Sequence, residues 1–276
     1  MTNLSFAPQP LYDKIGATYD ATRHAEPGIV DILVELLNLR TGGRVLDIGC
    51  GTGNYTNALQ ARGLAMLGLD RSGLMLRTAQ AKSELAKSGH APSGELTLVG
   101  ADAAALPFAD ESFAGAICTL AIHHFQDLEA SFAEAARILH NGRLVILTQL
   151  PEQIMRYWLR AYFPRMIERS ADQMPDWPTI EISLRRAGFR TWTQRLCWMP
   201  EQPVDLFLYS GKHQPHLYLD ERVRANISSF ANLADRDELG AGVERLKQDL
   251  ARGRFEQATS EYEDVGGDYL FIAAQV

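Results

Sequence analysis

The strongest candidate ligand site is a glycine-rich stretch near position 50. An apolar run at 44–48 leads directly into Gly49, Gly51 and Gly53. Because glycine has no Cβ atom, the chain can turn sharply there and a ligand can approach its backbone. Asp47 lies two positions before the first glycine, where its carboxylate would repel a pyrophosphate and attract positively charged groups. The stretch predicts a site for a cationic ligand, although Asp47 could instead only hydrogen-bond the loop backbone.

Aspartates also follow the next two apolar runs. Asp70 follows the run at 65–69, where a strand-end acid can accept hydrogen bonds from both ribose hydroxyls of an adenosine. Asp102 follows the run at 96–99 and can accept from an adenine amino group, while the Ala103 backbone N–H can donate to the ring. Each aspartate has a local alternative, because Asp70 could cap a helix and Asp102 could stabilise a turn. Together with the glycines, they favour a nucleoside site.

Two adjacent histidines, His123 and His124, follow the apolar run at 114–119 and are predicted near the reactive end of such a ligand. A histidine there could accept a proton from a second substrate, because its reference pKa lies close to neutrality. Adjacent side chains of an extended chain point in opposite directions, so we expect at most one of the two to face the site. The alternative is a pair of hydrogen-bonded structural histidines at the end of a strand.

The elements that must position these residues follow from the rhythm of apolar positions. Seven apolar runs are predicted to be strands, at 44–48, 65–69, 96–99, 114–119, 144–148, 189–198 and 269–274. Amphipathic helices are predicted between the early runs, at 55–62, 72–87 and 128–139. This alternation is typical of a parallel sheet covered by helices on both faces. The predicted fold class is therefore α/β, with a doubly wound sheet.

The chain divides into four predicted regions. These are an N-terminal helical cap at 1–40, a ligand-binding core at 41–199, a helical insertion at 200–265 and a final strand of the core sheet within 266–276. The insertion is a candidate contributor to a second-substrate site. The four tryptophans, Trp158, Trp177, Trp192 and Trp198, all precede it. They could line an apolar pocket or pack between the sheet and the insertion, and we favour packing.

Composition excludes several classes of function. The 276 residues include 27 basic and 34 acidic side chains, a net charge of −7, which argues against a sequence-independent nucleic-acid binder. No apolar run of about 18 residues predicts a membrane span. The start lacks the pattern of a signal peptide, and the three cysteines form no CxxC, so a cytoplasmic protein is expected. His213 and His216 have no evident carboxylate or cysteine partner, so no metal site is predicted.

Four motifs, in this order and spacing, resemble the class I S-adenosylmethionine-dependent methyltransferases, in particular the branch of ubiquinone/menaquinone-type small-molecule enzymes. They are VLDIGCGTG, LGLD, GADAAALPF and FAGAICTLAIHHF. The resemblance is specific over 44–148. It implies a seven-stranded, mostly parallel, Rossmann-like sheet whose last strand is antiparallel. It also implies S-adenosylmethionine as cofactor, S-adenosylhomocysteine as product and a small-molecule acceptor.

The resemblance also implies a role for each motif residue. Gly49, Gly51 and Gly53 would line the methionine part of the cofactor, and Asp47 would face its amino group. The other implied cofactor-binding residues are Asp70 at the ribose, the adjacent Arg71, Asp102 and Ala103 at the adenine, and Thr119, Leu120 and Ala121 beneath the methyl group. An N-terminal helix is similar to those that cap the cofactor in this branch. Its Tyr12, Tyr19 and Arg23 could close over the carboxylate, the two tyrosines sharing a helix face, although the segment could instead be a surface helix with two packed tyrosines.

Methyl transfer to a small molecule is the predicted function, and three alternatives stay open. Such a reaction requires alignment and exclusion of water, and a general base only if the acceptor starts protonated. A cyclopropane-forming, lipid-modifying relative would want a basic amphipathic surface, of which no strong example is found. A non-catalytic S-adenosylmethionine-binding protein would lack an enclosed acceptor cavity. A dinucleotide-dependent oxidoreductase is disfavoured by Asp47 and Asn54. The acceptor, the attacking atom and the oligomeric state are left open.

Overall fold

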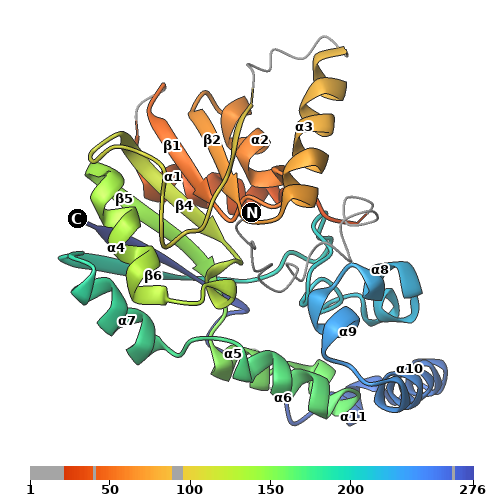
Figure 1. Ribbon diagram of the computed structural model, residues 1–276. Coiled ribbons are helices and arrows are strands. Elements are labelled where there is room, and N and C mark those ends of the chain that lie inside the picture. Colours follow the sequence, from red (N-terminus) through yellow and green to blue (C-terminus); the bar gives the residue numbers. More distant parts are fainter. Residues whose placement is uncertain (1–21, 40–41, 89–95, 263–264) are drawn as a thin grey trace, which may run out of the picture.

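The computed structural model describes residues 22–39, 42–88, 96–262 and 265–276. Its centre is a seven-stranded sheet with the order β3-β2-β1-β4-β5-β7-β6 (Figure 1). The strands are β1 (Arg44–Ile48), β2 (Ala65–Asp70), β3 (Thr97–Gly100), β4 (Phe113–Thr119), β5 (Leu139–Thr148), β6 (Thr191–Cys197) and β7 (Tyr269–Gln275). The first five run parallel, and β7 is antiparallel to both β5 and β6. The predicted fold class is confirmed.

Helices cover both faces of this sheet, and the alternation of side chains explains why. On one face, Val45, Val145 and Phe271 pack with residues of α1 (Pro27–Leu37) and α2 (Asn54–Ala61). On the other face, Leu46 and Leu144 pack with residues of α4 (Leu128–Ile138) and α7 (Trp177–Arg186). α3 (Gly73–Ser88) lies against β2 and β3. Successive side chains of the central strands therefore point to opposite faces of the sheet, and both faces are buried. This is why each strand appears as a continuous apolar run in the sequence.

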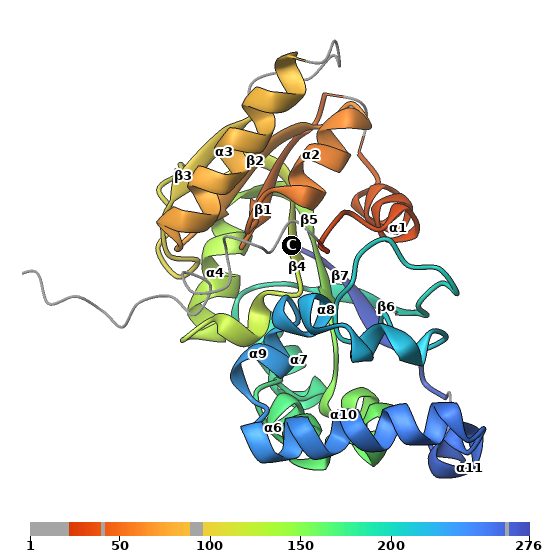
Figure 2. The ribbon, with the colours of Figure 1, turned by 90° about the vertical axis from the view of Figure 1, so that its right-hand side faces the viewer.

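A second, helical layer lies beyond the carboxyl ends of the parallel strands (Figure 2). We call it the cap layer, and it is built from two segments, 151–175 and 199–262. The first contains α5 (Pro151–Met155), η4 (Trp158–Ala161) and α6 (Pro164–Asp172). The second contains η5 (Pro215–Leu219), α8 (Glu221–Ala225), α9 (Ser228–Asn232), α10 (Arg236–Ala251) and α11 (Phe255–Thr259). α6 packs on α9, and α11 packs on η4, so the two segments form one body.

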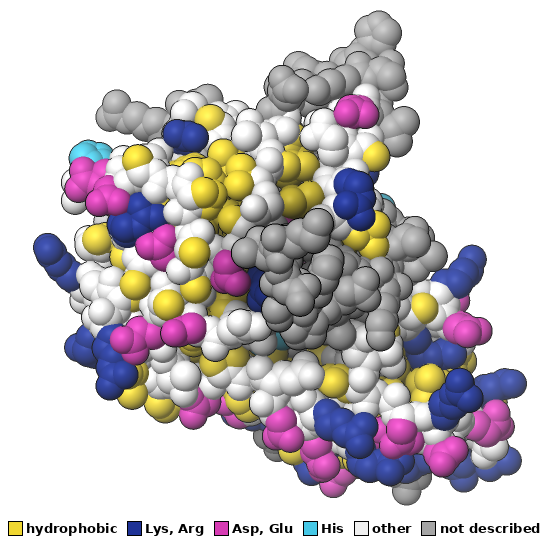
Figure 3. Space-filling view, in the orientation of Figure 1, with side chains coloured by type: hydrophobic (Ala, Val, Ile, Leu, Met, Phe, Trp, Pro, Cys, Tyr) yellow, Lys and Arg dark blue, Asp and Glu magenta, His cyan; other side chains and the backbone are white. Residues whose placement is uncertain are grey.

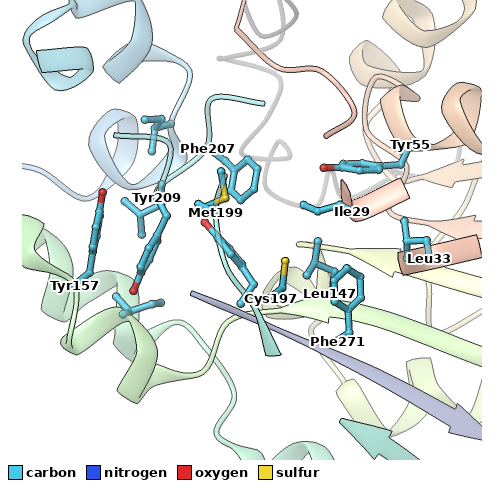
Figure 4. Close-up of a cluster of buried hydrophobic side chains, with 14 of the residues drawn as sticks. Ile29, Leu33, Tyr55, Leu147, Tyr157, Cys197, Met199, Phe207, Tyr209 and Phe271 are labelled. Carbon is cyan, nitrogen blue, oxygen red and sulfur yellow. The ribbon is translucent and has the colours of Figure 1, made fainter. Parts of the chain in front are cut away.

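One hydrophobic cluster joins the sheet to the cap layer (Figure 4). Tyr157 and Tyr209 stack with ring centroids 3.8 Å apart, and the edge of Phe207 meets the Tyr269 ring at 4.9 Å. The cluster continues through Met199 into the side chains of α1 and β5. The cap layer is therefore packed against the sheet by buried aromatic side chains, and its outer surface carries interspersed charges of both signs (Figure 3).

The structure corrects the predicted start of one strand and shows where two of the tryptophans lie. β5 begins at Leu139, five residues before the predicted 144, because His140 and Asn141 are polar and exposed and so hide the strand from an apolar pattern. The tryptophans at 158 and 177 do not line the main cavity. Trp158 instead packs its edge against Tyr162 and Phe255 in the cap layer. None of the helices among the described residues is long and apolar enough to cross a membrane.

Close packing of α10 predicts opposite effects for two alanine substitutions. A Cβ atom on Gly242 would lie 2.4 Å from the Phe163 ring and 2.5 Å from the Tyr162 carbonyl oxygen, whereas a Cβ on Gly240 would meet no atom within 4 Å. We expect Gly242→Ala to lower the free energy of unfolding by roughly 1–3 kcal/mol through overpacking. Gly240→Ala should raise it by up to about 1 kcal/mol, because alanine favours the helix. Urea unfolding of both variants measures the difference; equal effects would contradict the packing.

Candidate functional site

A cavity of about 390 Å³ lies between the carboxyl ends of the strands and the cap layer. The glycine-rich loop after β1 and the turn after β4 form part of its wall. These two strands are neighbours at the point where the strand order reverses, with β2 and β3 on one side and β5 on the other. Ligands of open α/β sheets bind in the crevice that opens at such a point. The topology therefore explains why the cavity lies here.

The glycine-rich loop turns because three glycines adopt positive φ angles. Gly49, Gly51 and Gly53 have φ values of 79°, 54° and 74°. The backbone N–H groups of Gly49 and Cys50 donate to the Leu69 carbonyl oxygen at 2.8 and 2.9 Å, which anchors the loop to β2. A Cβ atom on Gly49 would lie 2.7 Å from that of Ala121, so the loop also packs closely on the end of β4. Gly49 and Gly51 line the cavity, whereas Gly53, the N-cap of α2, is not among the lining residues.

Asp70 holds the loop and the next turn together. Its Oδ2 accepts a hydrogen bond from the Gly51 backbone N–H at 2.9 Å, and its Oδ1 accepts one from the Ser72 backbone N–H at 2.8 Å. The side chain lines the cavity at the end of β2. Both sequence-based interpretations of Asp70 are therefore compatible with its position, because the carboxylate fixes the turn before α3 and also faces the ligand space.

Asp47 lies beneath the loop and is not among the described lining residues of the cavity. Its side chain is fully buried, with Oδ2 accepting a hydrogen bond from the Thr56 hydroxyl at 2.6 Å, and Oδ1 has no partner among the described residues. Burial raises the pKa of Asp47 to about 7, assisted by the negative charge of Asp70 and opposed by the Thr56 hydrogen bond. The predicted contact between Asp47 and a cofactor amino group stays a prediction.

The residues predicted at the adenine and the methyl group line the cavity together. Asp102 and Ala103 follow β3, and the Asp102 carboxylate lies 3.5 Å from the Arg71 guanidinium. Thr119 ends β4, and Leu120 and Ala121 follow it; all three line the cavity. Leu120 has a φ of 52°, a left-handed conformation that is uncommon for a bulky side chain. Its backbone N–H donates to the Leu147 carbonyl oxygen at 2.8 Å, which holds this strained turn against β5.

Both histidines face the cavity, so the expectation that at most one would do so is wrong. They belong to a 3₁₀ turn, η3 (Ile122–His124), and not to an extended chain. The turn is closed by hydrogen bonds from the His124 N–H to the Ala121 carbonyl and from the Phe125 N–H to the Ile122 carbonyl. Side chains on such a turn are about 120° apart. The two imidazole rings accordingly lie beside each other, with centroids 3.9 Å apart.

Burial keeps both imidazoles neutral. It lowers the pKa of His123 to about 3, helped by the neighbouring His124, and the pKa of His124 to about 4. Nδ1 of His123 has no hydrogen-bond partner among the described residues. A neutral imidazole has one nitrogen that can accept a hydrogen bond. The pair can therefore accept a proton or a hydrogen bond from a ligand, but it does not present a positive charge.

The chain before α1 reaches the cavity through an ion pair that sequence reasoning missed. Arg23 Nε lies 2.6 Å from Oδ1 of Asp205, whose side chain is only 1% exposed. The Tyr55 hydroxyl donates to the other Asp205 oxygen at 3.1 Å. All three side chains line the cavity. No motif marks Asp205, because its partners are far away in sequence. Tyr12 and Tyr19, predicted beside Arg23, lie outside the described residues.

The cap layer supplies the remaining wall, and no motif in the sequence marks its individual residues. Ser170 and Gln173 come from α6 and its end, Ser228 and Ser229 from α9, and Phe207 and Leu208 from the segment after β6. The Ser170 and Ser229 hydroxyls are 2.7 Å apart. Gln149, which follows β5, and Tyr269, the first residue of β7, complete the wall. The cavity thus has a half lined by the strand-end loops and a half lined largely by the cap layer.

Comparison with known proteins shows that the chain is similar to one family of enzymes. The family model described as a methyltransferase domain matches residues 46–147. The demethylmenaquinone methyltransferase of Corynebacterium kroppenstedtii is 30% identical, in an alignment that covers 49% of the chain and 57% of that enzyme. The O-methyltransferase rstn1 of Aspergillus nomiae is 28% identical, over 56% of the chain and 68% of that enzyme. The chain thus matches little more than half the length of the first of these relatives.

A solved structure extends the likeness beyond the sheet. It comes from Anabaena variabilis and is described as a candidate methyltransferase from an antibiotic biosynthesis pathway. It superposes with a TM-score of 0.80 at 33% sequence identity, covering 92% of this chain and 99% of that one. Because fewer than a tenth of the residues are left out, the shared architecture includes most of the cap layer as well as the sheet.

The depressed histidine pKa values predict how the two rings respond to pH. As the pH falls from about 8 to about 5.5, neither imidazole should take up a proton, because both folded pKa values lie well below the reference of about 6.5. Side-chain NMR of histidine-labelled protein would measure the protonation of each ring as the pH is lowered, with the signals assigned from His123→Gln and His124→Gln variants. A midpoint above about pH 6 for either cavity histidine would contradict its buried, neutral state.

Proposed function

Because the chain belongs to the class I S-adenosylmethionine-dependent methyltransferases, we propose that it methylates an uncharged aromatic molecule that carries hydroxyl groups. The single observation that carries this proposal is the cavity, which continues from the glycine-rich loop into a half lined largely by the cap layer. Its size is that of an ordinary small-molecule site. A protein that only bound the cofactor would not need the second half.

The described residues of the first half fit S-adenosylmethionine. Gly51 lines the cavity, and a Cβ atom there would meet no protein atom within 4 Å, so the loop leaves open space for a ligand against its backbone. Asp70 and Asp102 place carboxylates at the ends of neighbouring strands, where hydroxyl and amino groups can be bound. We propose that Gly49, Gly51, Asp70, Asp102 and Ala103 hold this cofactor. When bound, it supplies a methyl group on a positively charged sulfur.

Charge distribution supports an uncharged acceptor. The formally charged residues among the described lining are Arg23, Asp70, Arg71, Asp102 and Asp205. Asp70, Arg71 and Asp102 lie at the proposed cofactor half, and Arg23 and Asp205 pair with each other. The rest of the lining offers serine, glutamine, tyrosine and neutral histidine side chains beside apolar ones. Burying a charged acceptor among them without a counter-ion would be costly, whereas hydroxyl groups would find hydrogen-bond partners.

The names of the relatives support an aromatic acceptor with oxygen substituents. One acts, by its name, on demethylmenaquinone, and others are O-methyltransferases. A quinol ring suits a wall that contains Ile154, Phe207 and Leu208 next to polar groups. Neither a lipid-modifying nor a non-catalytic role is favoured by any of these names. The segments 151–175 and 199–262 are proposed to determine which acceptor is bound, since they line the second half.

His123 is the proposed acceptor of the hydroxyl proton. Its Nδ1 lacks a partner among the described residues and its ring lines the cavity next to the turn at Leu120 and Ala121. Because the pKa of His123 is lowered to about 3, the imidazole holds a hydroxyl by a hydrogen bond and takes the proton only as the oxygen or the ring carbon attacks. The surrounding side chains orient the acceptor and exclude water, which is the main contribution a protein makes to this displacement.

Cofactor binding can be tested by calorimetric titration with S-adenosylhomocysteine and, separately, with NAD. We expect saturable binding of the first and none of the second. Asp70→Ala should weaken binding about 10- to 100-fold, because it removes a half-buried charged hydrogen-bond partner and releases the loop. Asp31→Ala, at an exposed carboxylate paired with Arg62, is the matched control and should bind normally. Folded protein that binds neither S-adenosylhomocysteine nor S-adenosylmethionine would refute the proposal, and NAD binding would point to the oxidoreductase alternative.

The proton-acceptor role predicts a catalytic loss without a loss of cofactor affinity. With 1,4-dihydroxynaphthalene as acceptor, kept reduced under nitrogen, we expect His123→Gln to lower kcat by about 100-fold or more. The dissociation constant of S-adenosylhomocysteine should stay within a factor of about two. His124→Gln provides the comparison for a change in the adjacent, stacked ring. Undiminished turnover by both variants would remove the histidines from the mechanism.

A further inference from the structure

The tyrosine that begins β7 has a hydroxyl group whose hydrogen finds no acceptor in the described part of the chain. Tyr269 is 1% exposed, lines the cavity, and its hydroxyl makes no hydrogen bond of acceptable geometry with any described residue. The backbone of Tyr209 is near enough to lower the pKa of this hydroxyl. A backbone N–H can only donate, however, so the hydroxyl hydrogen still lacks an acceptor. Leaving such a group unpaired in a buried site is unfavourable.

Neighbouring tyrosines in the same cluster are paired. The Tyr209 hydroxyl donates to the Gln153 carbonyl oxygen, and the Tyr157 and Tyr218 hydroxyls are 2.6 Å apart. The Tyr209 ring lies 5.4 Å from the Tyr269 ring, so these residues share one environment. The cluster therefore satisfies its buried hydroxyls in general. Tyr269 is the exception, and among these four tyrosines it is the one that lines the cavity.

The register of the sheet places Tyr269 at the height of the proposed reaction site. Thr119 pairs with Leu147, which pairs with Phe271. Tyr269 precedes Phe271 by two residues on an antiparallel strand, so it lies just beyond the level of Thr119, on the side of the carboxyl ends of the parallel strands and two strands away. Two strand spacings amount to about 10 Å between backbones, and the tyrosine side chain bridges part of that distance. One ring-sized molecule can therefore reach both the turn after β4 and the Tyr269 hydroxyl.

We propose that the Tyr269 hydroxyl donates a hydrogen bond to a second oxygen atom of the methyl acceptor, remote from the atom that is methylated, and thereby selects dioxygenated acceptors. This inference rests on the proposed function and specifies its substrate class. Burial, together with the nearby Tyr209 hydroxyl and the Asp268 carboxylate, holds the pKa of Tyr269 well above its usual value. The residue thus keeps its proton and acts as a hydrogen-bond donor and a positioning residue, not as a base.

A comparison of two ligands tests the contact. 1,4-Dihydroxynaphthalene and 1-naphthol differ by one hydroxyl group, and both would be titrated under nitrogen into protein saturated with S-adenosylhomocysteine. We expect the wild-type protein to bind the diol about three- to tenfold more tightly, the range for one hydrogen bond. Tyr269→Phe should lose this preference and bind 1-naphthol as the wild type does. The proposal is overturned if the variant keeps the preference, if the wild type has none, or if the wild type does not bind the diol.

Thermal unfolding separates this role from a structural one. Without ligand, we expect Tyr269→Phe to unfold at the same temperature as the wild type or higher, because it removes an unpaired buried hydroxyl. Tyr209→Phe, the matched control, should unfold about 2–4 °C lower, since it breaks the bond to Gln153. A comparable fall for Tyr269→Phe would overturn the inference. Failure of the wild type to bind S-adenosylhomocysteine would refute the proposed function. If the wild type binds S-adenosylhomocysteine and Tyr269→Phe still prefers the diol to 1-naphthol, only the present inference is refuted.

Discussion

The buried carboxylate of Asp205 is the constraint on which the closed cavity depends. It accepts hydrogen bonds from Arg23, Tyr55 and the His24 backbone, and so joins the chain before α1, the start of α2 and the segment after β6. Glu26 strengthens the junction by accepting from the backbone N–H groups of Val204 and Asp205. An uncompensated buried charge costs roughly 3–5 kcal/mol. These three parts of the chain are therefore held together as a unit, and with them the part of the cavity wall that Arg23, Tyr55 and Asp205 line.

Charge is separated within this cavity in a way that suits its proposed reaction. Carboxylates lie at the strand ends, whereas the charges of Arg23 and Asp205 in the other half pair with each other, and the histidines after β4 are kept uncharged by burial. A neutral wall contributes little repulsion or attraction along the path of the reacting groups. Selection between acceptors then depends on shape and on hydrogen bonds, which the serine, glutamine and tyrosine side chains supply. This arrangement lets the sheet and the cap layer carry different tasks.

The sequence predicted the sheet far better than the cap layer, and the reason is physical. Central strands are buried on both faces, so each leaves a continuous apolar run, and the glycine-rich loop needs residues without Cβ atoms at fixed positions. The start of β5 was missed where His140 and Asn141 are exposed. Three of the cap helices, α8, α9 and α11, are only five residues long and so too brief to leave a periodic pattern. Asp205 and Tyr269 acquire their meaning only from tertiary contacts.

The position of β7 in the sheet has a consequence for how the protein is made. β7 lies between β5 and β6, yet the ribosome synthesises it after every other strand and after the whole cap layer. Until it emerges, the nascent chain carries an incomplete sheet, in which β5 has an open apolar edge and β6 has no strand to pair with. Unpaired edges of this kind are prone to wrong association. A premature stop before residue 269 would therefore remove an internal strand of the sheet, and the truncated product would become a client of chaperones and proteases.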